Sequence, residues 1–285
     1  MVNYFPALFV FLWSTGFIGA KYGLPYAEPL TFLLWRYAAV IVLMGLIAWG
    51  ARAHWETNPR KLLHLAVAGM LIHGTYLGGV FEAISQGLPA GVVSLVVSMQ
   101  PVITAILAPF LLGERVLKLQ WLGIVLGLVG IGLVLSGRIQ TGFGLDGLEW
   151  AIVALLGITL GTLYQKRYCS NFDWRTGSVV QFIGATALTI PFALLTEHFQ
   201  VEWTGHFVFA LSWQVMVLSV GAVTLLNLLI RSGTAVNVAS LFYLVPPATA
   251  LIAWLMFDET FTLIQSVGLA VAITGVVLAR RQEQR

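Results

Sequence analysis

Long apolar runs separated by short polar breaks fill this sequence from end to end. A helix needs about 20 apolar residues to cross the roughly 30 Å hydrocarbon layer of a bilayer. When polar and turn residues are taken as connections, the pattern predicts ten spans, at 4–22, 30–51, 62–87, 90–112, 119–137, 148–168, 175–196, 208–231, 236–257 and 262–280. Transmembrane β-barrels instead show alternating strands of about ten residues, and this sequence has none. We therefore expect an all-α, polytopic membrane protein.

Charged residues are too few to cover a soluble surface. Only 9% of the 285 residues are charged and 59% are hydrophobic, whereas soluble domains carry about 25% charged residues. Cys169 is the only cysteine, so one chain can form neither a disulfide framework nor a thiol metal site. No positively charged stretch precedes the first span, so we expect a retained helix rather than a cleaved secretory signal.

Lysine and arginine are distributed unequally between the predicted loops. Short cytoplasmic loops of membrane proteins collect these residues. With a cytoplasmic N-terminus, twelve fall on the cytoplasmic side: Arg52, Arg60, Lys61, Arg115, Lys118, Lys166, Arg167, Arg175, Arg231, Arg280, Arg281 and Arg285. Only Lys21 and Arg138 fall outside, and Arg36 lies within the second span. The asymmetry predicts that both termini are cytoplasmic, and it accounts for the net charge of +3 without any nucleic-acid partner.

The second half of the chain repeats the first at an offset of 145 residues. The aligned pairs include Gly16–Gly161, Lys21–Lys166, Pro101–Pro246, Thr104–Thr249, Glu114–Glu259, Gln120–Gln265, Gly123–Gly268 and Gly130–Gly275. Each repeat contains five predicted spans, an odd number, so the second repeat must enter the membrane from the opposite side. Inverted repeats of this kind are typical of secondary transporters. We expect two five-helix repeats, 1–140 and 146–285.

Each repeat carries a proline in the middle of a predicted span. The two stretches are VVSMQPVITAIL at 96–107 and YLVPPATALIAW at 243–254. Proline lacks an N–H, so a carbonyl one turn earlier loses its partner, and such a break is tolerated at membrane depth where it is buried or lines a cavity. Prolines are also common in membrane helices, but Pro101 and Pro246 are related by the repeat. We expect both, with Ser98, Gln100 and Tyr243 beside them, to line a midplane cavity.

These motifs resemble the EamA family of the drug/metabolite transporter superfamily. The resemblance rests on FLWSTGFIGAKYG in the first span and on QPVITAILAPFLLGERVLKLQWLGIVLGLVGIGLVL, which is echoed by PPATALIAWLMFDETFTLIQSVGLAVAITGVVLA. It covers essentially the whole chain, and within the family the chain is most similar to amino-acid exporters of the YddG type. The resemblance implies ten helices in two inverted repeats, transport of small molecules by alternating access, and a central cavity lined by helices 1, 3, 4, 6, 8 and 9.

Two charged residues are predicted to lie within the membrane, where charged groups are costly and mark function by default. Arg36 and Glu82 fall at similar depths in the second and third spans, and their repeat partners are Gln181 and Asn227. A paired buried charge is tolerated better than a lone one. We therefore expect Arg36 and Glu82 to contact each other, either as a strut between helices or as a gate.

The other polar residues at depth are candidates for holding substrate. His73 precedes Tyr76 by almost one turn on the same face, although a membrane histidine can equally be a satisfied core residue. The predicted substrate-binding residues are Trp13, Ser14, His73, Tyr76, Ser98, Met99, Gln100, Thr162, Tyr164, Asn227 and Tyr243. Structural or gating roles are predicted for Arg36, Glu82, Pro101, Gln181 and Pro246. We expect Gln100 and Tyr243 to contact the substrate most directly.

The fifth span contains GIVLG at 123–127, a GxxxG motif. Such a motif lets another backbone approach closely. It predicts either packing within the chain or a dimer contact, so the protein is expected to be a monomer or a homodimer.

Motifs of several other classes of membrane protein are missing. No G-x-x-x-x-G-K-[ST] loop occurs, so the chain does not hydrolyse ATP by itself. Neither an H-E-x-x-H motif nor a cluster of acid–base groups indicates an enzyme. A channel or a membrane-embedded enzyme stays open as an alternative of a different class. We expect no cofactor and no metal, and as partners a small-molecule substrate and the lipid bilayer.

The charges at membrane depth also narrow the substrate class. Sugar-phosphate carriers of this superfamily need cationic residues to neutralise phosphate, and here His73 is the only potentially basic residue near the midplane. Small-cation antiporters of the superfamily need an acid in helix 1, where this chain has Trp13 and Ser14. Aromatic, amide and hydroxyl groups suit neutral or zwitterionic molecules. We therefore expect a secondary transporter of the inner membrane that exports aromatic and other hydrophobic amino acids. A sugar-phosphate carrier or a drug/cation antiporter is the alternative within the superfamily.

Overall fold

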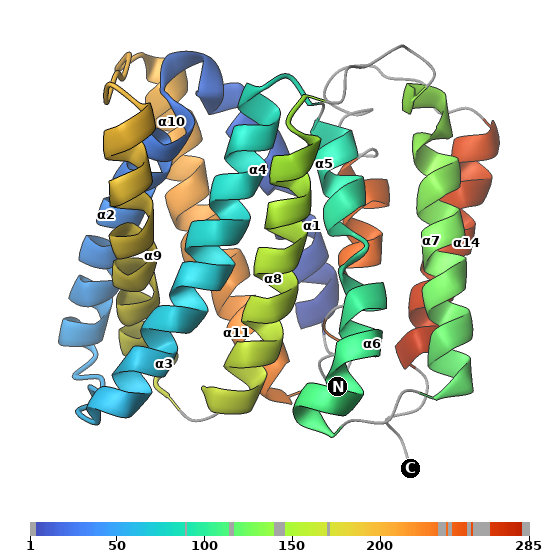
Figure 1. The fold of residues 1–285 in the computed structure, drawn as a ribbon, viewed down its shortest axis with the longest axis horizontal. Coiled ribbons are helices and arrows are strands. Elements are labelled where there is room, and N and C mark those ends of the chain that lie inside the picture. Colours follow the sequence, from blue (N-terminus) through green and yellow to red (C-terminus); the bar gives the residue numbers. More distant parts are fainter. Residues whose placement is uncertain are drawn as a thin grey trace.

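The computed structural model is a bundle of helices (Figure 1). It describes residues 4–88, 90–113, 117–139, 146–169, 172–232, 241–249 and 263–280, together with Val238 and Ile252. The first half contains α1 (Phe5–Gly23), α2 (Pro29–Gly50), α3 (Pro59–Gly69), α4 (Tyr76–Ser85), α5 (Ala90–Val97), α6 (Gln100–Leu112) and α7 (Lys118–Ile139). The second half contains α8 (Leu148–Tyr168), α9 (Trp174–Thr196), α10 (Gly205–Trp213), α11 (Val223–Ser232) and α14 (Leu263–Arg280).

The described helices agree with the predicted membrane spans. Seven of them, counting α3–α4, α5–α6 and α10–α11 as continuous segments, are long and apolar enough to cross a bilayer. Shorter apolar stretches in α7 and α14, Lys118–Gly130 and Ser266–Gly275, match two further predictions. The predicted span 236–257 lies mostly outside the described residues. The part of the chain that the structure describes is thus helical and contains several apolar helices, as the pattern predicts.

Two helices contain π-helical segments in their middle. Met70–Thr75 (η2) joins α3 to α4, and Gln214–Ala222 (η3) joins α10 to α11. Adding the repeat offset of 145 to the first gives 215–220, which lies inside the second. Segments of this kind often occur at functional sites. Here η2 packs against α8 and α9, and η3 packs against α1 and α2.

Hydrogen bonds between loops and helix termini define two ends of the bundle. At one end the Thr176 hydroxyl donates to the His54 carbonyl at 3.0 Å, and Lys166 Nζ donates to the Ile230 carbonyl at 2.8 Å. We call this the basic end because most described lysines and arginines gather there: Arg52, Arg60, Lys61, Lys118, Lys166, Arg167, Arg175, Arg231 and Arg280. We call the opposite end the acidic end, and it carries Glu28, Glu149, Glu197 and Glu202.

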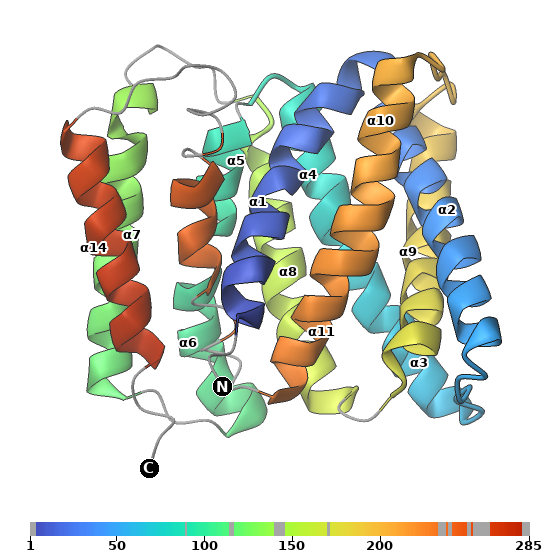
Figure 2. The ribbon, with the colours of Figure 1, turned by 180° about the vertical axis from the view of Figure 1, so that it is seen from behind.

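Corresponding helices of the two halves run in opposite directions. Helix α1 begins at the basic end and α8 begins at the acidic end, while α7 and α14 lie side by side and antiparallel (Figures 1 and 2). Helix α14 finishes at the basic end, where α1 begins. The view from behind shows α1 beside α10 and α11, so the two halves interlock along their lengths (Figure 2).

Helices α7 and α14 meet through glycine. A Cβ added at Gly130 would lie 2.4 Å from the backbone nitrogen of Ala272 and 2.6 Å from the carbonyl oxygen of Gly268. A Cβ added at Gly275 would lie 2.5 Å from the backbone nitrogen of Gly127. The repeat offset of 145 converts the first of these contacts into the second. The GxxxG motif at 123–127 therefore serves packing within the chain, which confirms one of the two predicted uses.

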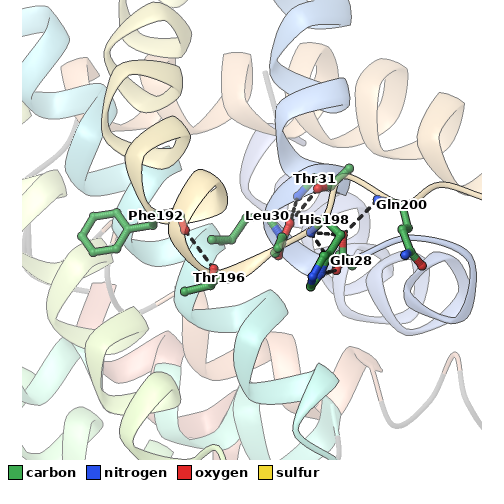
Figure 3. A network of polar contacts seen from close by, with 8 residues as sticks. Glu28, Leu30, Thr31, Phe192, Thr196, His198 and Gln200 are labelled. Atoms are coloured by element: carbon green, nitrogen blue, oxygen red, sulfur yellow. Dashed lines mark hydrogen bonds and ion pairs between the residues drawn. The ribbon is translucent and has the colours of Figure 1, made fainter.

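Two glutamates fasten the loops at the acidic end to each other (Figure 3). The Glu197 carboxylate accepts hydrogen bonds from the backbone N–H and the hydroxyl of Thr31, both at 2.7 Å, in the first turn of α2. In return, the Glu28 carboxylate accepts from the N–H groups of His198 and Gln200, at 3.0 and 2.9 Å. Each loop thus supplies the carboxylate that satisfies backbone donors of the other.

We expect this contact to weaken in acid. Burial raises the pKa of Glu28, but the Gln200 and His198 N–H groups lower it by more, so its pKa in the folded protein lies below the ordinary 4.5. A lowered pKa contributes stability that is present above pH 4.5 and is lost as pH falls through the folded-state pKa. Glu28→Gln should therefore flatten the fall in melting temperature below pH 4.5. Glu202→Gln at the same end is the control, and equal acid slopes in both variants would contradict the assignment.

Candidate functional site

A small cavity lies where α1, α2 and the η2–α4 segment meet η3 and α11. Its volume is about 30 Å³, which is enough for about two water molecules. Its polar lining comes from Trp13, Arg36, His73, Tyr76 and Gln214. We call it the Arg36 cavity. It brings together residues of both halves of the chain, and four of the five were predicted from the sequence to have a role in the site.

Arg36 is buried without an acidic partner. Its side chain is 3% exposed, and its Nε donates to the Ser219 hydroxyl at 2.9 Å. Among the described residues, ion pairs join Lys61 to Glu56, Arg175 to Asp173 and His198 to Glu28, and none involves Arg36. A buried guanidinium without a counter-ion is costly in a membrane protein. Among the described residues, the Ser219 hydroxyl is the hydrogen-bond partner that the Arg36 guanidinium has.

The predicted contact between Arg36 and Glu82 was wrong. Val80 lines the Arg36 cavity, whereas Glu82 lines a different and larger cavity beside Trp150. Val80 and Glu82 are two residues apart, which corresponds to about 200° around a helix of 3.6 residues per turn. Their side chains therefore leave α4 on nearly opposite faces. Arg36 and Glu82 were paired because their predicted spans place them at similar depth. The apolar pattern did not predict the rotation of each helix about its axis.

Aromatic rings form one side of the Arg36 cavity. Trp13 stacks on Tyr76 with ring centroids 6.0 Å apart and an interplanar angle of 13°. Its indole Nε1 also donates to the Tyr76 hydroxyl at 3.2 Å. The Phe242 ring meets Trp13 edge-on at 5.3 Å. Rings in these geometries attract each other beyond their burial, so Trp13 is held firmly between α4 and the segment that precedes Pro246.

His73 is fixed from two directions. Its ring stacks on Phe182 with centroids 4.2 Å apart, and the Tyr37 hydroxyl donates to its backbone carbonyl at 2.6 Å. The side chain is 1% exposed. The prediction that His73 and Tyr76 share a face is confirmed, since both line the Arg36 cavity.

A chain of three amides crosses the second half of the molecule. Gln181 Nε2 donates to Gln165 Oε1 at 2.8 Å, and Gln165 Nε2 donates to Asn227 Oδ1 at 2.7 Å. All three side chains are buried. Gln181 and Asn227, the repeat partners of Arg36 and Glu82, are thus joined through Gln165. The set of predicted site residues omitted Gln165, although a glutamine inside an apolar span is itself the signal.

Both proline breaks have their expected effect on the backbone. Helix α5 ends at Val97 and α6 begins at Gln100, so the helix is interrupted just before Pro101. On the other side, Leu241–Leu244 forms a 3₁₀ turn ahead of Pro246. Pro246 has no N–H for the carbonyl of Phe242, four residues earlier. That carbonyl accepts from the Ser98 hydroxyl at 3.2 Å instead.

Four further predicted residues lie around these breaks. Ser14 donates to the Val245 carbonyl at 3.2 Å, and Gln100 Nε2 donates to the Thr162 hydroxyl at 3.1 Å. Tyr243 is fully buried. Within the described part of the chain, Gln100 Oε1 and the Tyr243 hydroxyl have no hydrogen-bond partner. The structure thus gathers Ser14, Ser98, Gln100, Thr162 and Tyr243 around the two interrupted helices.

Two predicted residues lie apart from this group. Met99 is 37% exposed and continues the exposed face of Ile106 and Phe110 on α6. The Tyr164 hydroxyl hydrogen-bonds to His64 Nδ1 at 2.6 Å, near the basic end. Depth alone suggested both, but each side chain leaves its helix on another face. No group of three or more His, Cys, Asp or Glu side chains that could hold a metal occurs in the described part of the chain.

Comparison with known proteins gives a consistent picture. The EamA-like transporter family matches this chain twice, over residues 4–136 and over residues 146–281. The chain is 26% identical over 282 residues to "Uncharacterized transporter YvbV" of Bacillus subtilis, covering 98% of this chain and 91% of that protein. It is 26% identical over 291 residues to a "Probable amino-acid metabolite efflux pump" of Escherichia coli, covering 95% and 92%.

Two further likenesses extend over nearly the full length. "Uncharacterized inner membrane transporter YedA" of Escherichia coli is 27% identical over 281 residues, covering 96% of this chain and 89% of that protein. A solved crystal structure superposes with a TM-score of 0.79 at 18% identity, covering 97% and 95% of the two chains, so the fold is shared. Together with the apolar helices and the double match, these findings show that the chain is a membrane transporter of the EamA-like transporter family.

Proposed function

We propose that this transporter exports small zwitterionic metabolites, with aromatic and other hydrophobic amino acids as its main substrates. The observation that carries the proposal is Arg36, a buried guanidinium without an acidic partner in the described chain, on a cavity shared by both halves. The forked donors of arginine match the two oxygens of a carboxylate. An amino-acid carboxylate would supply the missing counter-ion.

The rest of the Arg36 cavity suits the side chain of such a substrate. Trp13 and Tyr76 offer aromatic surface beside the guanidinium, and apolar or aromatic side chains pack favourably on such rings. The volume of about 30 Å³ is too small for an amino acid. Substrate would enter only when the helices around the cavity separate, as they do in alternating access.

Gln100 and Tyr243 are proposed as the second part of the site. Each carries a buried polar atom without a partner in the described chain, and leaving such an atom unsatisfied costs about 1–3 kcal/mol. Gln100 Oε1 can accept from a substrate ammonium group. The two parts are connected, because the Trp13 ring at the Arg36 cavity touches Phe242, the neighbour of Tyr243.

We further propose ten transmembrane helices in two inverted repeats, 1–140 and 146–285. Three observations support this: the opposite directions of α1 and α8, the π-helical segments at equivalent positions, and the reciprocal glycine contacts of α7 and α14. Inverted repeats with a site between them at the midplane are a common basis of alternating access.

The basic end is proposed to face the cytoplasm, together with both termini, because short cytoplasmic loops collect lysine and arginine. Single cysteines in a Cys169→Ser background provide the test. Gln200→Cys at the acidic end should react with a membrane-impermeant maleimide added to intact cells. Asn58→Cys at the basic end should react only after the cells are opened. The reverse pattern would overturn the orientation.

Transport by the purified protein in liposomes tests the substrate class. Labelled phenylalanine should be taken up with saturation and should show counterflow, as expected for a carrier. Phenethylamine lacks only the carboxylate and should be transported at least about tenfold more slowly, since each ~1.4 kcal/mol of lost interaction is a factor of ten. Equal rates for the two compounds would refute the role of Arg36. Transport of a sugar phosphate or a lipophilic cation in place of phenylalanine would support the alternative carriers, and uptake without saturation would support a channel.

A further inference from the structure

A second and larger cavity lies on the side of the bundle, away from the Arg36 cavity. It measures about 400 Å³, and no residue lines both cavities. The η2–α4 segment forms its floor, α8 and α9 form its walls, and the start of α2 closes it. We call it the lateral groove. Its main lining residues are Gly78, Glu82, Trp150, Val153, Leu188 and Phe192. In Figure 1, α4 is visible between α9 and α8.

The walls of the lateral groove border the lipid-facing surface. On α9, Ile190 and Phe192 are exposed, and on α8 the exposed residues Ile152 and Leu156 adjoin the wall. The groove extends from Gln86, near the acidic end, to Gly74 in the middle of the α3–α4 span. A molecule could therefore reach it from the acidic side of the membrane without entering the Arg36 cavity.

Glu82 gives the lateral groove its chemical character. It is half-buried and takes part in none of the ion pairs among the described residues. The like-charged Glu197 is nearby and makes the site more negative. The Ser85 hydroxyl is neutral and donates to the Glu82 backbone carbonyl at 2.9 Å. A carboxylate at membrane depth among apolar side chains favours a cationic partner. The other polar lining groups, such as Thr75 and Thr189, are uncharged.

Glycine keeps the floor of the groove open. A Cβ added at Gly78 would have only Leu30 Cδ2 within 4 Å, at 3.9 Å. The next residue differs, because a Cβ at Gly79 would lie 2.5 Å from the Trp150 carbonyl. Gly79 is thus required for the packing of α4 on α8. Gly78 is not required for packing, and a larger side chain there would fill the groove.

We propose that the lateral groove binds a small amphipathic ammonium ion, with its charged nitrogen on Glu82 and its apolar body against Trp150 and Phe192. The groove volume falls within the range of roughly 300–1,000 Å³ that is usual for small-molecule sites. A tetraalkyl or arylalkyl ammonium satisfies both requirements, since it offers a charge to the carboxylate and its cation can also lie on the Trp150 ring. This occupant differs in charge from the zwitterion proposed for the Arg36 cavity. The two proposals can therefore be tested independently of each other.

Equilibrium dialysis of the full-length protein in nanodiscs tests the proposal. Phosphatidylglycerol nanodiscs contain no ammonium headgroup, so a bound lipid amine cannot compete. The probes are benzyltriethylammonium and N,N-diethylphenylacetamide, a neutral molecule of similar size, with empty nanodiscs subtracted. Glu82→Gln should weaken binding of the ammonium at least tenfold and leave binding of the amide unchanged. Glu149→Gln, an exposed acid beside Trp150, should change neither and controls for surface charge.

Gly78→Leu supplies a test that does not depend on charge. It should abolish binding of both probes while the melting temperature stays at the wild-type value or rises, because leucine favours helix over glycine. Wild-type protein that binds the amide as tightly as the ammonium, or Glu82→Gln protein that keeps its ammonium affinity, would show that Glu82 does not hold a cation in the groove. Either result would overturn the proposal. Loss of phenylalanine transport on changing Arg36 would bear only on the proposed function.

Discussion

Arg36→Met should reduce phenylalanine transport by at least about 100-fold while leaving the folded protein as stable as the wild type or more so. Truncating one partner of a buried, hydrogen-bonded charge pair costs about 2–5 kcal/mol, and each ~1.4 kcal/mol is a factor of ten. Stability should not fall, because Arg36 has no acidic partner in the described chain to leave unpaired. Ser219 also keeps a partner, since its hydroxyl donates to the Gln214 carbonyl at 3.0 Å.

Two further variants define this result. Arg36→Lys keeps the charge but loses the forked geometry, so transport should be intermediate. Arg52→Met, at an exposed position of the basic end, should leave transport and melting temperature unchanged. If Arg36 were a structural strut, the methionine variant would melt at a lower temperature and its loss of transport would follow the loss of folded protein. That outcome would remove Arg36 from the proposed site.

Gly130→Leu should disrupt the pairing of α7 with α14. A Cβ at this position would lie 2.4 Å from one backbone atom of α14 and 2.6 Å from another, and backbone atoms cannot move aside without separating the helices. Overpacking typically costs 1–3 kcal/mol and occasionally more, and we expect about 3 kcal/mol or more here. At about 2–4 °C per kcal/mol for a chain of this size, the melting temperature in detergent should fall by at least about 6 °C.

Gly132→Leu is the matched control on the same helix. A Cβ at Gly132 would meet no atom within 4 Å, and the residue is exposed. This variant should keep the wild-type melting temperature or raise it slightly, because leucine is a better helix former than glycine. Equal melting temperatures for the two variants would mean that α7 and α14 do not pack as closely as described.

The sequence predicts most helices well because the cost of exposing polar groups to lipid is large. The ends of the helices are less predictable, since they lie where water and headgroups tolerate either state. The third span was predicted from residue 62, but α3 begins at Pro59, where the Asn58 side chain accepts from the Arg60 N–H. In the same way α10 begins at Gly205, behind a Thr204 cap, rather than at 208. Capping residues add a polar turn to the apolar run.

Rotation about a helix axis could not be predicted from the apolar pattern. In a soluble protein the polar face marks the outside, whereas lipid-facing and core-facing residues here are equally apolar. Arg36 and Glu82 were therefore paired by depth, although Glu82 leaves α4 on the face of the lateral groove. For the same reason, the pattern did not show that Met99 and Tyr164 lie apart from the other predicted residues. Residues beside the prolines were placed better, because a broken helix constrains where its neighbours lie: Ser98 does reach the Phe242 carbonyl.

The π-helical segments carry information about the history of the chain. A π turn holds one residue more than an α turn, so it is what a single inserted residue leaves behind in a helix. Met70–Thr75 and Gln214–Ala222 occupy equivalent positions in the two halves. The simplest history is one insertion in an ancestor of half the present length, before its gene was duplicated. On that account, deleting one residue from Met70–Thr75 would restore the older α-helix and leave Val80 on the Arg36 cavity and Glu82 on the lateral groove, because the wide turn had absorbed the extra residue.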